Sequence, residues 1–407
     1  MSELFGDTKR QLKELIRALH AGVHPEEVKK SFQEILADLS PADVARVEQE
    51  LIEEGLLTTE VRKLCDVHLA IFRESLDKEK VSTPPGHPIH ILMEEHKIIS
   101  QSAEELKNVA QRITEAKDTA SIRTGLEQLG HIVEHLKDAE SHHIREENVL
   151  FPYLEKHGIT QPPAIMWMEH DEIRKQKKRL YALAQKCQAV SYADFPRELD
   201  EVATSLAQLI PSHVYKENQI LYPTALKVIT PNEWKDIRKQ FDDLGYCCFT
   251  PESARGTETV HTSAAEARVE HEKVMFETGS LSHQELETML NTLPLDITFV
   301  DKDDVVRYFS KPRERIFPRA IAVIGRKVQQ CHPQKSVHVV NQILQDFKSG
   351  KRDSAEFWIE LKDRKIYIRY FALRNHSGDY LGCMEATQDI TNIQKLRGEK
   401  RLLEPTQ

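Results

Sequence analysis

Apolar residues recur with a helical period through much of the chain before residue 230. In the segment 89–113 one stripe is apolar, formed by Leu92, Ile99, Ala103, Leu106 and Ala110. Residues spaced three, four or seven apart lie on one face of a helix. Three similar stripes follow, with breaks before Pro163 and around Pro196. Four long helices joined by modest loops predict an up-down four-helix bundle over residues 89–230.

The segments that flank this bundle have other patterns. Residues 1–76 read as short helices and predict an all-α N-terminal domain. Residues 77–88 are charged and then contain Pro-Pro-Gly, which cannot continue a helix, so they are expected to form a linker. Residues 231–282 are expected to be a connector, with one helix, a polar stretch and a second, charged helix that ends near Gly279.

Residues 283–395 have the alternating, β-rich pattern of strands. Five such runs are separated by turn signals: DITFVD, VVRYFS, AEFWIEL, KIYIRYFAL and YLGCMEATQDI. Helical pieces are expected at 319–327 and 335–348, between the second and third strand. This order predicts an α+β domain with an antiparallel sheet, followed by a short tail at 396–407. The chain is therefore expected to be multidomain.

Histidines fall on the apolar stripes of the predicted bundle. Each helix places one on its core side: His96, His143, His170 and His213. One turn after the second and fourth come Glu147 and Glu217, and Glu140 also lies on a stripe, whereas His90 and His142 fall on other faces. Buried imidazoles and carboxylates are costly unless they are paired or bind metal. Mixed nitrogen and oxygen ligands inside a helix bundle favour a pair of iron ions, with manganese or zinc as alternatives.

Each of these residues taken alone has a plainer interpretation. A single inward histidine is more often a packed core residue, and a His-x-x-x-Glu pair often lies on a helix surface. The coincidence of six such positions, all in phase with the core, is what favours a metal centre.

Composition and charge limit the partners. The chain has 407 residues, with 56 Lys and Arg against 65 Asp and Glu, a net charge of −9. Such a chain is a poor candidate for non-specific binding to nucleic acid or acidic membranes. We find no signal peptide and no apolar run that could span a bilayer. Six cysteines, scattered except for Cys247 and Cys248, indicate a reducing cytoplasm.

Two segments of the bundle resemble each other and a known family. HIREENVLFP (143–152) and HVYKENQILYP (213–223), with EEHKII and MEHDEI before them, resemble the repeated signature of the hemerythrin-like cation-binding domain. The resemblance implies two non-haem, carboxylate-bridged iron ions. It also implies the ligands His96, His143, Glu147, His170, His213 and Glu217.

The match to the oxygen-carrying members of that family is incomplete. They have a further histidine where this chain has Met166, and an aspartate after the last histidine where this chain has Glu217. Simple oxygen carriage is therefore in doubt. One iron could be left open, or His90, Glu140 or a tyrosine could complete the site, the tyrosines nearby being Tyr153, Tyr181 and Tyr222.

The flanking domains also resemble known families. KLCDVHLAIF (63–72) resembles an uncharacterised helical domain that precedes such bundles, and its Cys65 and His68 could bind metal, react with oxidants or only pack. The C-terminal strands, ending in QDIT (388–391), resemble a PAS sensor domain. Such domains bind haem, flavin or small metabolites, or only pair with other domains. Cys331-His332 could offer an axial haem ligand, although one such pair in a loop is usually only a loop.

These features together predict a cytoplasmic, non-enzymatic di-iron sensor of oxygen, nitric oxide, peroxide or redox state. The PAS domain would relay the signal to a partner protein, and could pair with a second copy. Two alternatives stay open: an iron-handling or di-iron oxidoreductase that reduces nitric oxide or peroxide or repairs iron clusters, and a scaffold with a structural metal. The sequence contains no kinase, cyclase or DNA-binding motif, so the output is expected to lie on another chain.

Overall fold

The computed structural model describes four stretches of the chain, 82–116, 118–186, 194–255 and 273–399, and five isolated positions before residue 24. The chain divides into two compact units, Met1–Thr259 and Val260–Gln407. The expected N-terminal domain over 1–76 lies outside the described residues apart from those five positions. The helices described below therefore begin at α5.

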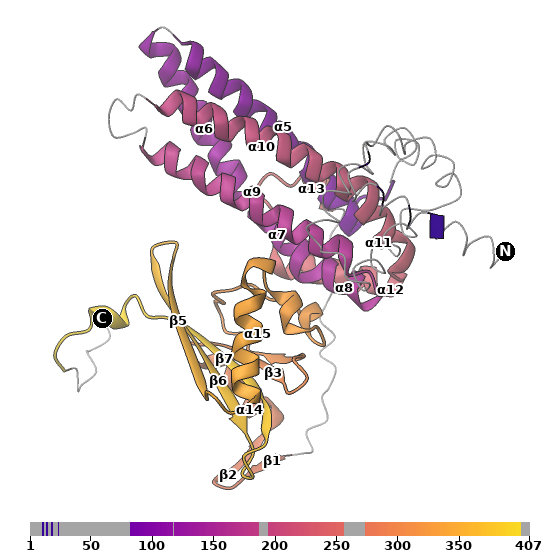
Figure 1. The fold of residues 1–407 in the computed structure, drawn as a ribbon, viewed down its shortest axis with the longest axis vertical. Coiled ribbons are helices and arrows are strands. Elements are labelled where there is room, and N and C mark those ends of the chain that lie inside the picture. The colour runs from indigo at the N-terminus through magenta and orange to yellow at the C-terminus, as the bar shows by residue number, and fades with distance from the viewer. Residues whose placement is uncertain are drawn as a thin grey trace. The chain divides into compact units, whose positions relative to one another are not determined.

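Four long helices form the first unit: α5 (Pro88–Glu115), α6 (Thr119–Asp138), α9 (Gln161–Lys186) and α10 (Phe195–Lys216). They pack as an up-down bundle in which α5 and α9 each contact both α6 and α10 (Figure 1). Their inner faces form one continuous apolar core that includes Leu106, Leu136 and Leu206. The predicted bundle is confirmed.

The second and fourth predicted helices are each interrupted by a turn of π-helix. After α6 come α7 (Glu140–Arg145), the π-helix η1 (Glu146–Leu150) and α8 (Phe151–Lys156). After α10 come the π-helix η3 (Glu217–Leu221) and α11 (Tyr222–Val228). Single π turns inside α-helices are rare and occur frequently at functional sites.

Proline explains where these π turns form. Pro152 and Pro223 each come after a π turn, with one residue in between. A proline has no N–H to donate, and its ring clashes with the carbonyl four residues earlier in an α-helix. The residue before each proline instead donates its N–H five residues back, from Phe151 to Glu146 O and from Tyr222 to Glu217 O. The wider turn relieves the clash.

Part of the expected connector packs on the bundle. Helix α12 (Pro231–Leu244) begins at a capping box formed by Thr230 and Glu233. Its apolar face is buried, and both α12 and the short α13 (Glu252–Arg255) contact α5. The chain from 231 to 255 therefore belongs to the same unit as the bundle.

The second unit contains a five-stranded antiparallel sheet in the order β4-β3-β7-β6-β5. The strands are β3 (Asp296–Asp301), β4 (Val306–Phe309), β5 (Ser354–Leu361), β6 (Arg364–Arg374) and β7 (Tyr380–Asp389). Helix α15 (Gln334–Lys348) packs its buried Leu344 and Phe347 with the inner residues of the sheet. The predicted α+β domain is confirmed.

Two predicted helical segments have a different structure. Residues 273–282 form an antiparallel hairpin of β1 (Lys273–Phe276) and β2 (Gly279–Ser282), followed by α14 (His283–Thr292), so the charged helix expected up to Gly279 is wrong there. Gly279 has φ 152°, which breaks a helix. Over 319–327 only a 3-10 turn, η4 (Ile321–Val323), forms, because Gly325 turns the chain at φ 88°.

The remaining elements of this unit are two short 3-10 turns, η5 (Val328–Cys331) and η6 (Ile393–Lys395). Among all the helices that the structure describes, none is both long and apolar enough to cross a bilayer.

Candidate metal centre

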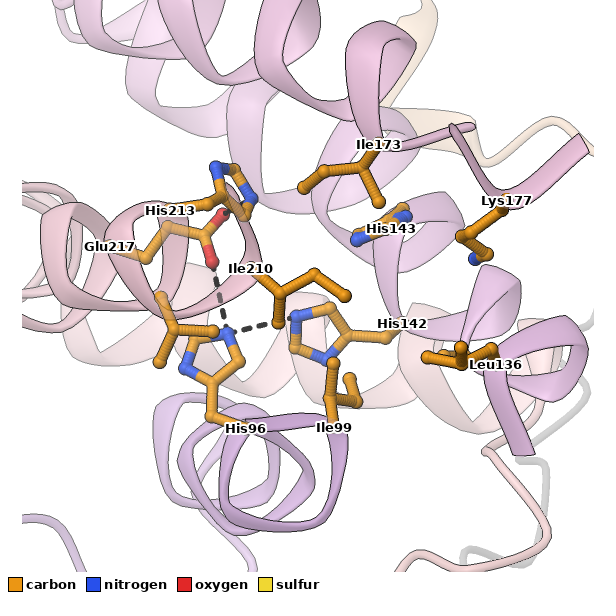
Figure 2. A pocket seen from close by; sticks show the side chains of 12 residues that line it. His96, Ile99, Leu136, His142, His143, Ile173, Lys177, Ile210, His213 and Glu217 are labelled. Atoms are coloured by element: carbon orange, nitrogen blue, oxygen red, sulfur yellow. Dashed lines mark hydrogen bonds and ion pairs between the residues drawn. The ribbon is translucent and has the colours of Figure 1, made fainter. Parts of the chain in front are cut away.

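Seven buried histidines and glutamates meet at the level of the two π turns. They form two groups of potential ligands, and within each group the donor atoms lie within 4.8 Å of one another. The first group is His96, His142, Glu146 and Glu217; the second is His143, His170 and His213. None of the seven is more than 5% exposed. Figure 2 shows most of them converging from separate helices.

The two glutamates lie between the two groups. Glu217 places Oε2 3.0 Å from His96 Nε2 and Oε1 3.1 Å from His213 Nε2. Glu146 places Oε2 3.4 Å from His142 Nε2 and 3.5 Å from His170 Nε2. Each carboxylate thus reaches an imidazole of both groups, which is the position that a ligand bridging two cations needs.

An outer layer of acceptors orients four of the imidazoles. The Nδ1 of each lies beside one oxygen: His142 at 2.7 Å from Glu95, His170 at 2.7 Å from Glu147, His213 at 2.9 Å from Glu169 and His96 at 3.0 Å from Asn218. A proton on Nδ1 that is donated to the acceptor leaves the Nε2 lone pair free. The four Nε2 atoms face the centre in the form that binds metal.

Cationic side chains pair with the three carboxylate acceptors. Arg145 pairs with Glu95, Lys216 with Glu169 and Arg174 with Glu147. Burial alone would raise the pKa of Glu95, but the hydrogen bond from His142 and the charge of Arg145 lower it to about 2. The pKa of Glu169 is likewise lowered to about 2, because His213 and Lys216 outweigh burial. Glu95 and Glu169 therefore stay negative and favour the Nδ1–H tautomers of His142 and His213.

The two halves of the bundle repeat this arrangement. His142, Arg145 and Glu146 have the spacing of His213, Lys216 and Glu217. Glu95 on α5 binds the first histidine of that set, and Glu169 on α9 binds its counterpart. The acceptors Glu147 and Asn218 each directly follow a central glutamate. The centre is thus built twice, with an internal two-fold relation.

The centre leaves polar atoms unsatisfied that a cation would satisfy. Several of the buried side-chain atoms without a hydrogen-bond partner among the described residues belong to the centre: His143 Nδ1, Glu146 Oε2, His170 Nε2, His213 Nε2 and both oxygens of Glu217. Such atoms are rare inside proteins and costly. Burial opposes a proton on His170, but the nearby carboxylates of Glu146 and Glu147 raise the pKa of His170 well above its ordinary value.

Comparison with protein families agrees with this geometry. Residues 87–225 match the Hemerythrin HHE cation binding domain. Because of this match, we call the bundle the HHE domain. Residues 286–391 match a PAS domain, and residues 12–78 match a family of unknown function, DUF438. The predicted three-part resemblance is confirmed.

Several solved structures are similar to part of this chain. A C-terminal domain of a protein from Streptococcus mutans is 33% identical and covers 31% of this chain and 98% of its own, with a TM-score of 0.30. A PAS domain from Colwellia psychrerythraea is 15% identical and covers 27% and 97%, with a TM-score of 0.22. A sensory box sensor histidine kinase from Vibrio cholerae is 15% identical and covers 26% and 89%, with a TM-score of 0.21. No curated protein matches the chain significantly.

The HHE domain brings together five of the six predicted ligands: His96, His143, His170, His213 and Glu217. Glu147 stays outside both groups, because its carboxylate binds His170 and Arg174.

His142 and Glu146 take part instead, and the expectation that His142 points elsewhere is wrong. A helical phase that continues unbroken from Leu136 does not hold here, because α6 ends before Ala139 and a π turn begins at Glu146. Aligning the two repeats on Pro152 and Pro223 would have paired His142 with His213 and Glu146 with Glu217.

The additional candidates in the HHE domain lie at different depths. Tyr222 is in the centre, where its hydroxyl donates to Glu146 Oε1 at 2.7 Å and lies 3.2 Å from His96 Nε2. Glu140 is 38% exposed on its side chain and accepts from Arg174. Tyr153 binds Gln240. His90 is not part of either group of ligands among the described residues, and the ring of Tyr181 lies 5.6 Å from Lys137 Nζ.

Two predicted sites lie elsewhere. Cys65 and His68 are outside the described residues. In the PAS domain His332 Nδ1 lies 2.8 Å from Val328 O, to which it donates. Neither Cys331 nor His332 belongs to a metal-ligand group within the described residues, so a haem there stays a prediction.

Proposed function

We propose that the HHE domain holds two iron ions and acts as a sensor. His96 and His142 would bind one ion, His143, His170 and His213 the other, and Glu146 and Glu217 would bridge them. Five imidazoles and two carboxylates suit non-haem iron. When bound, such a pair supplies a redox-active position for oxygen, nitric oxide or peroxide. His143 would replace the further histidine of the oxygen carriers, whose position is occupied by Met166 in this chain.

The observation that carries the sensor proposal is a chain of hydrogen bonds from the centre to the segment 245–255. Glu95 accepts from His142 and also from Thr250 Oγ1 at 2.5 Å. Arg145, paired with the same carboxylate, donates to Gly245 O at 2.6 Å and lies 5.0 Å from the Tyr246 ring. Any shift of His142 therefore moves the acceptor that anchors this segment.

The segment 245–255 is well placed to carry a signal onward along the chain. Its far end is held to the start of the bundle, where Gly86 N–H donates to Ala254 O at 2.8 Å. From Arg255 the chain continues through residues 256–272 to the PAS unit. We propose that a change at the centre loosens or tightens this segment and so biases the PAS domain, which contacts a partner protein. A cytoplasmic location is part of the same proposal.

The test compares hydrogen exchange of the full chain with and without iron, and in the reduced and oxidised states. In the wild type, protection over 245–255 and in the PAS domain should change with the state of the centre. Thr250→Val removes the hydroxyl that binds Glu95, so the change in the PAS domain should be lost while iron content is kept.

Thr224→Val is the matched control for this test. Thr224 is also buried, but its hydroxyl has no hydrogen-bond partner among the described residues. In the Thr224→Val variant, hydrogen exchange of the PAS domain should change with the state of the centre as it does in the wild type. A PAS domain that exchanges identically in every state of the wild type would contradict the sensor proposal.

A second candidate function is a di-iron oxidoreductase or iron donor. It is favoured by a small cavity beside the centre, lined by His143, His213 and Glu217, because a space for an outside ligand is what turnover needs. Catalytic consumption of nitric oxide or peroxide would favour this enzyme. A single event per centre would favour the sensor.

A further inference from the structure

One lysine lies inside the HHE core where the helical pattern calls for an apolar residue. Lys177 continues the inner stripe of α9, between Ile173 and Leu180, and is only 4% exposed. A buried ammonium group in an apolar core is costly unless it has a role or a partner. It takes no part in the ligand groups or in the hydrogen-bond chain to Thr250.

Lys177 lines the cavity beside the proposed metal centre. The apolar residues that line the cavity are Ile99, Leu136, Ala139, Ile173, Ile210 and Val214. Five residues of the proposed metal centre also line it: His96, His142, His143, His213 and Glu217. The space measures about 10 Å³ for the centre of a water-sized molecule, roughly what one water requires. Figure 2 shows Lys177 beside His143 on the wall of this cavity.

The charge of Lys177 is only partly compensated. Its nearest carboxylate oxygen is Glu140 Oε2, at 3.7 Å. Glu140 is shared with Arg174, which donates to its Oε1 from Nε at 2.8 Å and lies 2.7 Å away through Nη2. Arg174 also pairs with Glu147, but that carboxylate binds His170 as well. Lys177 and Arg174 thus share the partly exposed carboxylate of Glu140. A positive charge therefore faces an enclosed space of low dielectric, where its field is strong.

The other half of the domain lacks this charge. Lys177 follows His170 by the spacing at which Ala103 follows His96, and Ala103 is fully buried. In the same way His143 follows His142 where Val214 follows His213. The two-fold repeat is thus broken by polar residues on one side of the centre only, and both of these residues line the cavity.

We propose that Lys177 makes the cavity selective for a small monovalent anion bound at the metal centre, with azide as its simplest probe. This inference rests on the proposed di-iron centre. The ammonium group would stabilise negative charge on that part of the ligand that enters this water-sized space, whereas a neutral ligand would gain little from it. Lys177 is thereby a specificity-determining residue rather than a ligand.

The test is an optical titration of the oxidised, iron-loaded full chain with azide, after iron content and helix content have been checked for each variant. Lys177→Met keeps an unbranched side chain, one atom shorter, and removes the charge, so the dissociation constant for azide should rise about tenfold or more. Lys177→Arg keeps the charge and should stay within about threefold of the wild type. Lys175→Met, on the exposed side of the same helix, should change nothing.

Nitric oxide binding to the reduced protein separates selectivity from structure. Lys177→Met should alter nitric oxide affinity by less than about twofold, since the ligand is neutral. Unchanged azide affinity, or an equal loss for azide and nitric oxide, would overturn the inference while leaving the di-iron centre intact. A wild-type chain that takes up no iron would overturn both.

Discussion

Glu146 and Glu147 are adjacent residues with different surroundings. Glu146 faces the centre, is fully buried and has an oxygen without a hydrogen bond among the described residues. Glu147 is held by His170 and by two bonds from Arg174, at 2.7 and 3.0 Å. One residue is placed to bridge cations and the other to orient a ligand, although both fit a His-x-x-x-Glu pattern.

Replacing each of these carboxylates by its amide tests the assignment. Glu146→Gln should leave the chain with about one iron or none, because a neutral amide bridges cations poorly. Glu147→Gln should keep both ions and weaken affinity by about 10–100-fold, the usual effect of an outer-layer substitution. Iron content and an affinity titration measure the two effects. The reverse ranking would show that the centre uses Glu147.

At the scale of the element, the π turns explain why the centre could be predicted from the sequence only in part. The helices, the internal repeat and five of the grouped residues follow from periodicity. The exact helical phase does not follow from periodicity, because a proline-induced π turn shifts the phase by a fraction of a turn. In the same region, the sequence HHIREE contains two overlapping His-x-x-x-Glu pairs. Lys177 stands out in the sequence as a charged residue on an apolar stripe, although lysine is not a typical metal ligand.

Helix α5, which provides His96, begins at an unusual cap. His87 Nδ1 accepts a hydrogen bond from Ile89 N–H at 3.2 Å, which requires an unprotonated Nδ1. Burial, and next the charge of the nearby His90, lower the pKa of His87 from 6.5 to about 4. The cap therefore works only while the ring is neutral.

The sign of its pH dependence follows from this lowered pKa. The folded state binds the proton less well than the unfolded state, so the contribution of His87 is fully present above pH 6.5 and is lost as the pH falls towards about 4. His87→Asn keeps a good cap without titrating. Its melting temperature should thus fall less than that of the wild type over this window. Parallel curves for the two proteins would contradict the role of the cap.

At the scale of the whole molecule, the chain joins a cation-binding bundle to a PAS domain through one continuous polypeptide. Both folds could be predicted because each has its own period and turn residues. The packing of the segment 245–255 could not be predicted. Its contacts with Glu95 and Arg145 join residues some 100 to 155 positions apart in sequence. The proposed route of the signal depends on those long-range contacts.

The two units should respond separately to damage in one of them. Gly382 pairs with Asp301 across β7 and β3, at φ 154°, and a Cβ there would overlap Val300 O. Gly382→Ala should destabilise the PAS domain by about 3 kcal/mol or more and leave iron binding unchanged. Calorimetry with iron analysis measures both. A joint loss of both units in Gly382→Ala would contradict their independence.

Gly130→Ala, in open space on α6, should stabilise the bundle by up to about 1 kcal/mol.

The central claim is that seven side chains of the HHE domain hold two bridged iron ions. The most direct measurement is anomalous diffraction at the iron edge from crystals of the full chain, loaded with iron in the absence of air. We predict two peaks per chain, with Glu146 and Glu217 between them and His96, His142, His143, His170 and His213 around them. A single peak, no peak, or a centre bridged by Glu147 in place of Glu146 would contradict the account.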